Sequence, residues 1–286
     1  MTDYLVYDVF TDTAFGGNQL AIMPDAHGLP EDSLQKIARE FNFSESTFVF
    51  PPEDPGHTAR VRIFTPTSEL PFAGHPTIGT AVALADLGRG GPDMVLELGV
   101  GPIPCSVTGN RARFDTSVPL TREAELDADL MAASLGLDPS QIRTAAHAPV
   151  FAGVGLPFAI VELSDRAALA ACLPDLAAMR SAARPVHGVL KFSVFAYVRD
   201  AQEIDARMFS PLAGIPEDPA TGSASAALTA LLGELDNRSQ PFAIRQGDDM
   251  GRPSRIFSDV TVENGKSEKV SIAGQAIRTM EGRLTL

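Results

Sequence analysis

The sequence predicts an α+β protein built from two similar halves, each a strand barrel or sheet wrapped around one central helix. Three observations lead to this fold class. The chain has 286 residues, more than one domain usually holds, and its length favours two. Short β-type runs recur along the whole chain with one or two helical patterns per half. The third observation is an internal repeat.

The repeat sets Arg62–Pro66 beside Arg207–Pro211, at an offset of 145 residues. After a slip of two residues it continues from Pro76–Ala81 to Pro219–Ala224. Both copies then enter stretches rich in Ala and Leu that end at Gly88 and Gly233, where we expect the two helices to end. The repeat therefore predicts that each half contains a strand, a Pro-containing loop and an Ala-rich helix in the same order. Chance similarity of segments rich in Pro, Gly and Ala is the alternative.

The other elements follow from periodicity and turn composition. A helix is expected between Pro30 and Asn42, because its apolar residues fall on one face, and a second is expected over Asp127–Leu135. The expected strands are Leu5–Phe10, Leu20–Met23, a run beginning at Thr47, Arg60–Phe64, Phe151–Leu163 and Gly188–Val198. The domains are expected to be 1–118, completed by the C-terminal strand 275–286, and 119–274.

Composition excludes several classes of partner. The net charge of −13 disfavours nucleic acid and anionic membrane surfaces, which bind basic proteins. The N-terminus lacks the pattern of a signal peptide, and no apolar stretch of ~18 residues is present, so we expect a cytoplasmic protein without membrane spans. Cys105 and Cys172 stand in apolar company and are expected to be buried structural thiols.

Two repeated helix starts carry the first chemical prediction. Gly74 and Gly222 stand where the two Ala-rich helices are expected to begin. The N–H groups and positive dipole end of a helix start bind a carboxylate or phosphate, and glycine permits close approach. If the two halves bring these starts together, an anionic ligand would lie between them. The alternative is that both are ordinary N-caps, with Asp218 and Ser223 capping locally.

Glu45 and His75 are the candidates for moving a proton. Glu45 lies between a helix and a strand with Phe43 and Phe48 on either side, and burial there would suit it to acid/base work. His75 stands in a Gly-His-Pro turn. An exposed glutamate and an inert loop histidine are the alternatives.

Other chemistries lack their motifs. The sequence shows no dinucleotide fingerprint, phosphate-binding P-loop or Gly-x-Ser-x-Gly elbow, and its five histidines have no metal-ligand spacing. Cofactor-free acid/base chemistry or simple binding remains, and we expect no cofactor and no metal.

Five segments, in this order along essentially the whole chain, resemble the phenazine-biosynthesis-like isomerases, which share the diaminopimelate epimerase fold. They are Asp8–Phe10 with Phe15–Asn18, Phe43–Val49, Phe72–Thr77, Glu217–Ala224, and Gln246–Gly247 with Gly251–Ser254. One departure is Gln19, where the family usually has proline after the Gly-Asn pair. We expect it to change a turn rather than the chemistry.

The resemblance implies two pseudo-symmetric barrel domains with the active site in the cleft between them. It implies that Glu45 is the principal acid and base, that His75 and Asp218 assist it, and that the substrate is a small, cyclic, unsaturated carboxylate. The substrate-binding residues it implies are Asn18, Gly74, Thr221, Gly222 and Ser223. A homodimer is expected because it is the commonest closed assembly.

Two alternatives to this isomerase stay open. The related epimerases and racemases use a cysteine from each half, but the corresponding positions here carry Ala73 and Ala220–Thr221. Neither alanine nor threonine can replace a thiolate as a base. A racemase or epimerase would then use Glu45 and Asp218 as opposed bases. A non-catalytic protein that binds small carboxylates is the other alternative.

Overall fold

The structure, a computed structural model, describes residues 2–186 and 192–285. The chain divides into two compact units, the first Met1–Asp115 with Ile272–Leu286 and the second Thr116–Ser271. The expected strand at Gly188–Val198 appears as β12, which begins only at Val194. Residues 188–191 of that expected strand lie outside the described residues.

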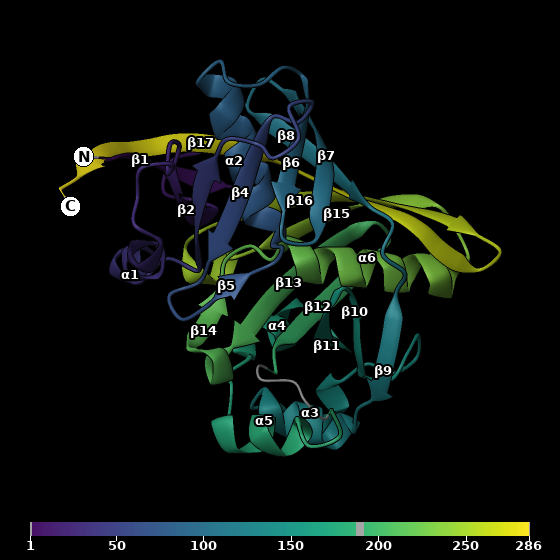
Figure 1. The fold of residues 1–286 in the computed structure, drawn as a ribbon. Coiled ribbons are helices and arrows are strands. Elements are labelled where there is room, and N and C mark those ends of the chain that lie inside the picture. The colour runs from purple at the N-terminus through teal and green to yellow at the C-terminus, as the bar shows by residue number, and fades with distance from the viewer. Residues whose placement is uncertain (1, 187–191, 286) are drawn as a thin grey trace. The chain divides into compact units, whose positions relative to one another are not determined.

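Unit 1 is a closed barrel of β-strands. Within the described residues, eight strands each bond to the next until the last returns to the first. Their order around the barrel is β1 (Thr2–Val9), β2 (Asn18–Met23), β3 (Glu45–Phe50), β4 (Ala59–Phe64), β6 (Asp93–Leu98), β7 (Gly101–Thr108), β8 (Arg111–Thr116) and β17 (Lys266–Leu284). Because β17 lies along β1, the two ends of the chain are neighbours (Figure 1).

Helix α2 (Gly74–Asp86) forms the core of this barrel. It contacts β1, β2, β3, β6 and β7, and its residues are buried from Gly74 through Leu84. Such a predominantly apolar helix is stable only when it is surrounded. Gly79 allows it to lie close to the sheet, because a Cβ there would stand 2.6 Å from the Leu20 side chain. Helix α1 (Glu31–Phe41) covers the barrel from outside, with Leu34, Ile37 and Ala38 buried.

Unit 2 repeats this topology. Its strands pair in the order β9 (Thr121–Glu125), β10 (Val150–Val154), β11 (Leu156–Glu162), β12 (Val194–Asp200), β13 (Glu203–Ser210), β15 (Gln240–Gln246) and β16 (Ser254–Glu263). The pairs β11–β12 and β13–β15 are parallel, as β2–β3 and β4–β6 are in unit 1. The predicted α+β class is confirmed, and the internal repeat corresponds to real structural similarity.

The helices of unit 2 complete the repeat. Helix α6 (Gly222–Asp236) contacts β10, β11, β15 and β16 and is the counterpart of α2. A short strand precedes each central helix, β5 (Glu69–Leu70) before α2 and β14 (Ile215–Asp218) before α6. Among the described residues of unit 2 there are three further α-helices, α3 (Ala128–Ser134), α4 (Arg166–Ala171) and α5 (Leu176–Ala182).

Two predicted boundaries are wrong. Helix α6 does not end at Gly233 but continues to Asp236, where Asn237 adopts the left-handed conformation that ends helices. Gly233 serves packing instead, since a Cβ there would stand 2.5 Å from Val260. Strand β3 begins at Glu45 rather than Thr47, because its parallel pairing with β2 already starts at Leu20 and Glu45.

Candidate active site

In unit 1 the structure brings Glu45 and His75 together. Glu45 opens β3, and His75 is the second residue of α2. Glu45 Oε2 lies 3.1 Å from His75 Nδ1, and the two side chains are only 15% and 4% exposed. Neither is the solvated side chain of the alternative interpretation. The two residues proposed from sequence for proton transfer are therefore a contacting pair.

The other nitrogen of His75 fixes where the protons of this pair can be. Nε2 lies 3.3 Å from the main-chain oxygen of Gln19. A carbonyl oxygen only accepts hydrogen bonds, so Nε2 carries a hydrogen. A proton on either Nδ1 or the Glu45 carboxyl would complete a hydrogen bond between the two groups. The contact therefore provides a direct path for a proton between the two side chains.

Gln19 is the residue at which the sequence departs from the family pattern. It lies inside β2, opposite Asp8 of β1, and not in a turn as expected. The β1–β2 pairing begins at Asn18, which leaves no turn for Gln19 to alter. Its contribution to His75 is a main-chain oxygen, which a proline would also supply.

Asn18 and Gly74 stand close to this pair in the chain and in the fold. Asn18 is buried at the start of β2, and its Oδ1 accepts a hydrogen bond of 3.1 Å from Ser44, the residue before Glu45. Gly74 opens α2, whose N-cap residue Ala73 has no side-chain oxygen to cap it. Asn18 thus helps to fix the main chain that carries Glu45. The start of α2, in contrast to an ordinary N-cap, has no side chain among the described residues that caps it.

Unit 2 holds a buried carboxylate just before its central helix. Asp218 ends β14 and is 5% exposed, and it accepts a hydrogen bond of 2.5 Å from the Thr221 hydroxyl. Gln246, at the end of β15, forms hydrogen bonds with both Asp218 and Thr221. Its Nε2 donates to the Asp218 carbonyl at 2.8 Å and to Thr221 Oγ1 at 3.0 Å, and its Oε1 accepts from the Thr221 N–H at 3.1 Å. Every hydrogen-bonding atom of this side chain thus fixes the turn that leads into α6.

The start of α6 contradicts the simple capping interpretation. Thr221 is the N-cap residue, yet within the described residues its side chain makes no capping bond and turns to Asp218 instead. Asp218 lies in a strand and is not the cap. Gly222, the first residue of α6, is buried, and Ser223 after it is partly exposed.

The sequence singled out Gln246–Gly247 as part of a motif but gave neither residue a role. Gly247 has φ +77°, and a Cβ there would stand 2.3 Å from the Arg252 oxygen and 2.7 Å from the Pro219 oxygen. Glycine is therefore required where this turn meets the segment before α6. The Gln-Gly pair of that motif is the signal that could have drawn attention to this support.

The cysteines stand apart from both helix starts. Cys105 lies in β7 and Cys172 at the end of α4, and burial raises the pKa of each thiol to about 12. The predicted buried thiols are confirmed, and neither supplies a thiolate near neutral pH. Among residues 2–186 and 192–285, no group of three His, Cys, Asp or Glu side chains could hold a metal ion. In the same part of the chain no helix has the length and apolarity to cross a membrane.

Comparison with known proteins identifies the family. The family model described as phenazine biosynthesis-like protein matches residues 7–282. The chain belongs to this family. It is 38% identical to an uncharacterized isomerase of Mesorhizobium japonicum, over 99% of this chain and 98% of that protein. It is 34% identical to the trans-2,3-dihydro-3-hydroxyanthranilate isomerase of Pseudomonas fluorescens, over the full length of both.

A solved structure agrees with these relatives. The phenazine biosynthesis protein of the PhzF family from Bacillus anthracis superimposes with a TM-score of 0.88 at 24% identity, over 100% of this chain and 99% of that one. The predicted family and the predicted diaminopimelate epimerase-like fold are confirmed. The protein is an isomerase, as the sequence predicted.

Proposed function

We propose that this isomerase moves a proton between two carbons of a small carboxylate, with Glu45 as both acid and base. The observation that carries the proposal is the contact of Glu45 with His75 in a largely buried position. A carboxylate in direct contact with an imidazole has a neighbouring group that can hold and return a proton. The name of the Pseudomonas fluorescens relative points to the substrate class, a cyclic, unsaturated carboxylate.

The chemistry needs no net change of atoms or electrons. The Glu45 carboxylate removes a proton from a carbon next to a double bond, the electron pair shifts along the conjugated system, and the proton returns to another carbon. His75 keeps Glu45 supplied with its proton. Asp218 is the proposed second acid/base group. No cofactor and no metal ion take part in this scheme.

The remaining proposed residues orient the substrate. The first amides of α2 at Gly74 and of α6 at Gly222 are the proposed donors to its carboxylate, because the N-terminus of a helix favours an anion. Asn18, Thr221 and Ser223 are the proposed polar contacts. The enzyme is further proposed to work in the cytoplasm and to form a homodimer. Light scattering of the purified protein would test the homodimer by measuring its mass in solution.

Proton exchange tests the proposal directly. The protein is incubated in D₂O with trans-2,3-dihydro-3-hydroxyanthranilate, and then with a panel of unsaturated and amino carboxylates, while the C–H signals are followed by NMR. We expect the wild type to exchange a carbon-bound proton and Glu45→Gln to lose this by ~10²–10⁴-fold, the usual contribution of a general acid/base.

Glu40→Gln is the matched control, because Glu40 is an exposed carboxylate near the end of α1. It should exchange at the wild-type rate. Exchange in Glu45→Gln at the wild-type rate would contradict the assignment of Glu45. Inversion at a single carbon, seen by chiral chromatography, would show a racemase in place of the proposed isomerase.

A further inference from the structure

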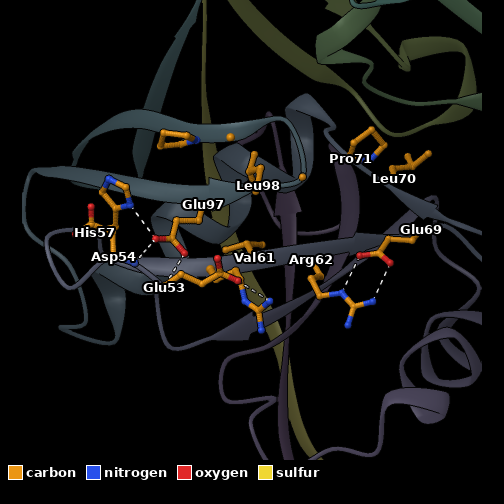
Figure 2. A pocket seen from close by; sticks show the side chains of 14 residues that line it. Glu53, Asp54, His57, Val61, Arg62, Glu69, Leu70, Pro71, Glu97 and Leu98 are labelled. Atoms are coloured by element: carbon orange, nitrogen blue, oxygen red, sulfur yellow. Dashed lines mark hydrogen bonds and ion pairs between the residues drawn. The ribbon is translucent and has the colours of Figure 1, made fainter.

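Two arginines at matching positions of the internal repeat make the same pair with a glutamate. Arg62 on β4 donates from Nε and Nη2 to the two oxygens of Glu69 on β5, at 2.7 and 2.8 Å (Figure 2). Arg207 on β13 donates from the same atoms to Glu217 on β14, at 2.7 and 2.9 Å. A two-point contact between a planar guanidinium and a carboxylate fixes direction as well as distance.

Each arginine also stacks in the same way. Its guanidinium lies over the ring of the phenylalanine two residues later, at 5.1 Å for Arg62 on Phe64 and at 4.8 Å for Arg207 on Phe209. The ring holds the guanidinium from one side while the carboxylate holds its edge. Both pairs tie the short strand before a central helix to the barrel strand beside it. Each pair therefore holds the strand that leads into one of the two central helices.

In unit 2 the pair lies next to the proposed chemistry. Glu217 directly precedes Asp218 in β14. Asp218 pairs with Met208 of β13, and the register shifts between this pair and that of Ser210 with Ile215. Arg207 and Met208 are successive residues of β13 and point to opposite faces, so Glu217, the partner of Arg207, lies on the face opposite to Asp218. Holding Glu217 on its face therefore constrains the direction of Asp218. Arg207 is itself well anchored, because its Nη1 lies within hydrogen-bond distance of the main-chain oxygens of the last turn of α4, at 3.0–3.2 Å, and its side chain is only 11% exposed.

The counterpart in unit 1 is looser. Arg62 is 21% exposed, and its second partner is Glu31 on α1, whose side chain is 75% exposed. Five residues separate Glu69 from His75, whereas Glu217 and Asp218 are adjacent. The contact between Arg62 and Glu69 therefore constrains His75, a proposed catalytic residue of unit 1, less than the contact between Arg207 and Glu217 constrains Asp218.

We propose that Arg207, acting through Glu217, is a positioning residue that sets the direction of Asp218 and of the first residues of α6. Arg62 and Glu69 do the same, more weakly, for the start of α2. The inference rests on the proposed function, because it assigns a role to residues that support Asp218 and the helix starts.

The test combines kinetics with amide hydrogen exchange in Arg207→Met. We expect kcat for the exchange reaction to fall about tenfold or more with a smaller change in KM, because the substrate still binds but the acid/base group is misdirected. Amides of residues 218–223 should exchange faster than in the wild type. Arg207→Lys keeps the charge but not the two-point contact, so it should restore little of the kcat.

Arg199→Met is the matched control. Arg199 also makes a two-point contact with a carboxylate, that of Asp236, and lies 5.4 Å from the Phe242 ring, but it stands at the C-terminal end of α6. It should lower the melting temperature and leave kcat unchanged. A double variant of Arg207→Met and Glu217→Gln should lose no more kcat than Arg207→Met alone, since each substitution removes the same contact between Arg207 and Glu217.

The outcomes separate the two proposals. A wild-type kcat in Arg207→Met, or a kcat that is restored in full by lysine, overturns the positioning role. An equal loss of kcat in Arg199→Met also overturns it, because the effect would then follow stability alone. Absence of exchange in the wild type with every compound contradicts the proposed function itself, and the present inference fails with it.

Discussion

The two carboxylates, Glu45 of unit 1 and Asp218 of unit 2, stand in different elements of the repeated scaffold and have different neighbours. Glu45 opens β3, whereas Asp218 precedes Pro219 as His75 precedes Pro76 in the other copy of the repeat. Glu45 contacts the imidazole of His75, a group that can carry a proton. Asp218 accepts from a threonine hydroxyl that a glutamine amide supports, and neither of these groups changes its protonation near neutral pH. The contacts of each carboxylate, rather than its place in the repeat, therefore distinguish the two, since Glu45 is directed to an imidazole and Asp218 is held in one orientation.

Removing the imidazole should have the largest effect. In His75→Asn the Glu45 carboxyl loses the neighbouring group that can hold and return a proton, and we expect kcat to fall on the order of 10²-fold with KM little changed. Steady-state kinetics of the isomerisation would measure both constants.

His57 offers a matched control for that variant. Its Nδ1 lies 2.8 Å from the Glu97 carboxylate, so the same kind of pair occurs in unit 1 away from the central helix (Figure 2). His57→Asn should keep the wild-type kcat. A similar loss in both variants would mean that the His75 effect comes from general destabilisation of the barrel.

Removing the side-chain amide of Gln246 in unit 2 should have an intermediate effect on kcat. Gln246→Leu leaves the Asp218 oxygen and the Thr221 N–H without this partner in a buried position, at a cost of ~1–3 kcal/mol for each group. We expect a lower free energy of unfolding in urea and a kcat reduced about tenfold.

Gln240→Leu is the control for Gln246, since Gln240 is also buried on β15 but donates to Asp236 at the far end of α6. It should lower stability without lowering kcat. If Gln246→Leu kept the wild-type kcat, the fixed orientation of Asp218 would have no part in the reaction.

The smallest effect is expected from Glu97, and it concerns stability at acid pH. The backbone N–H groups of Glu53 and Asp54 donate to its carboxylate at 2.7 and 2.8 Å, and with His57 they hold its pKa at about 2. Because this is below the ordinary value of 4.5, the carboxylate stabilises the fold above pH 4.5, and this stabilisation is lost as the pH falls towards 2.

Glu97→Gln should therefore melt at a lower temperature than the wild type at pH 7 and show a smaller decline between pH 4.5 and 2. Thermal unfolding followed by circular dichroism at several pH values would measure this. Equal declines in the two proteins would show that the pair does not contribute to acid sensitivity. The kcat at pH 7 should not change.

Much of the fold could be predicted from the sequence, because each half repeats the same local signals. The alternation in Arg60–Phe64 and the apolar face of the helix after Pro30 both reflect burial that local periodicity records. The end of α6 could not be predicted, since Gly233 is explained by a contact with Val260 of another element. The start of β3 was missed for a similar reason, because its first pair depends on the register with β2.

The candidate site was predictable as a set of residues but not as a set of contacts. Glu45 and His75 are 30 positions apart in the chain, and their contact depends on how α2 lies against β3. The support from Gln246 depends in the same way on the parallel pairing of β13 with β15. Neither arginine pair could be inferred from the repeat alone, because the partner glutamates are not at equivalent offsets.

Strand β17 has a consequence for how the protein is made. It completes the barrel of unit 1 by pairing with β1, so that Thr2 lies opposite Leu284. A ribosome delivers all of unit 2 before the residues that close unit 1, and the first half synthesised is the last to be finished. Until then β1 has an open edge that invites pairing with other chains. Loss of the last dozen residues should therefore harm the opposite end of the chain first.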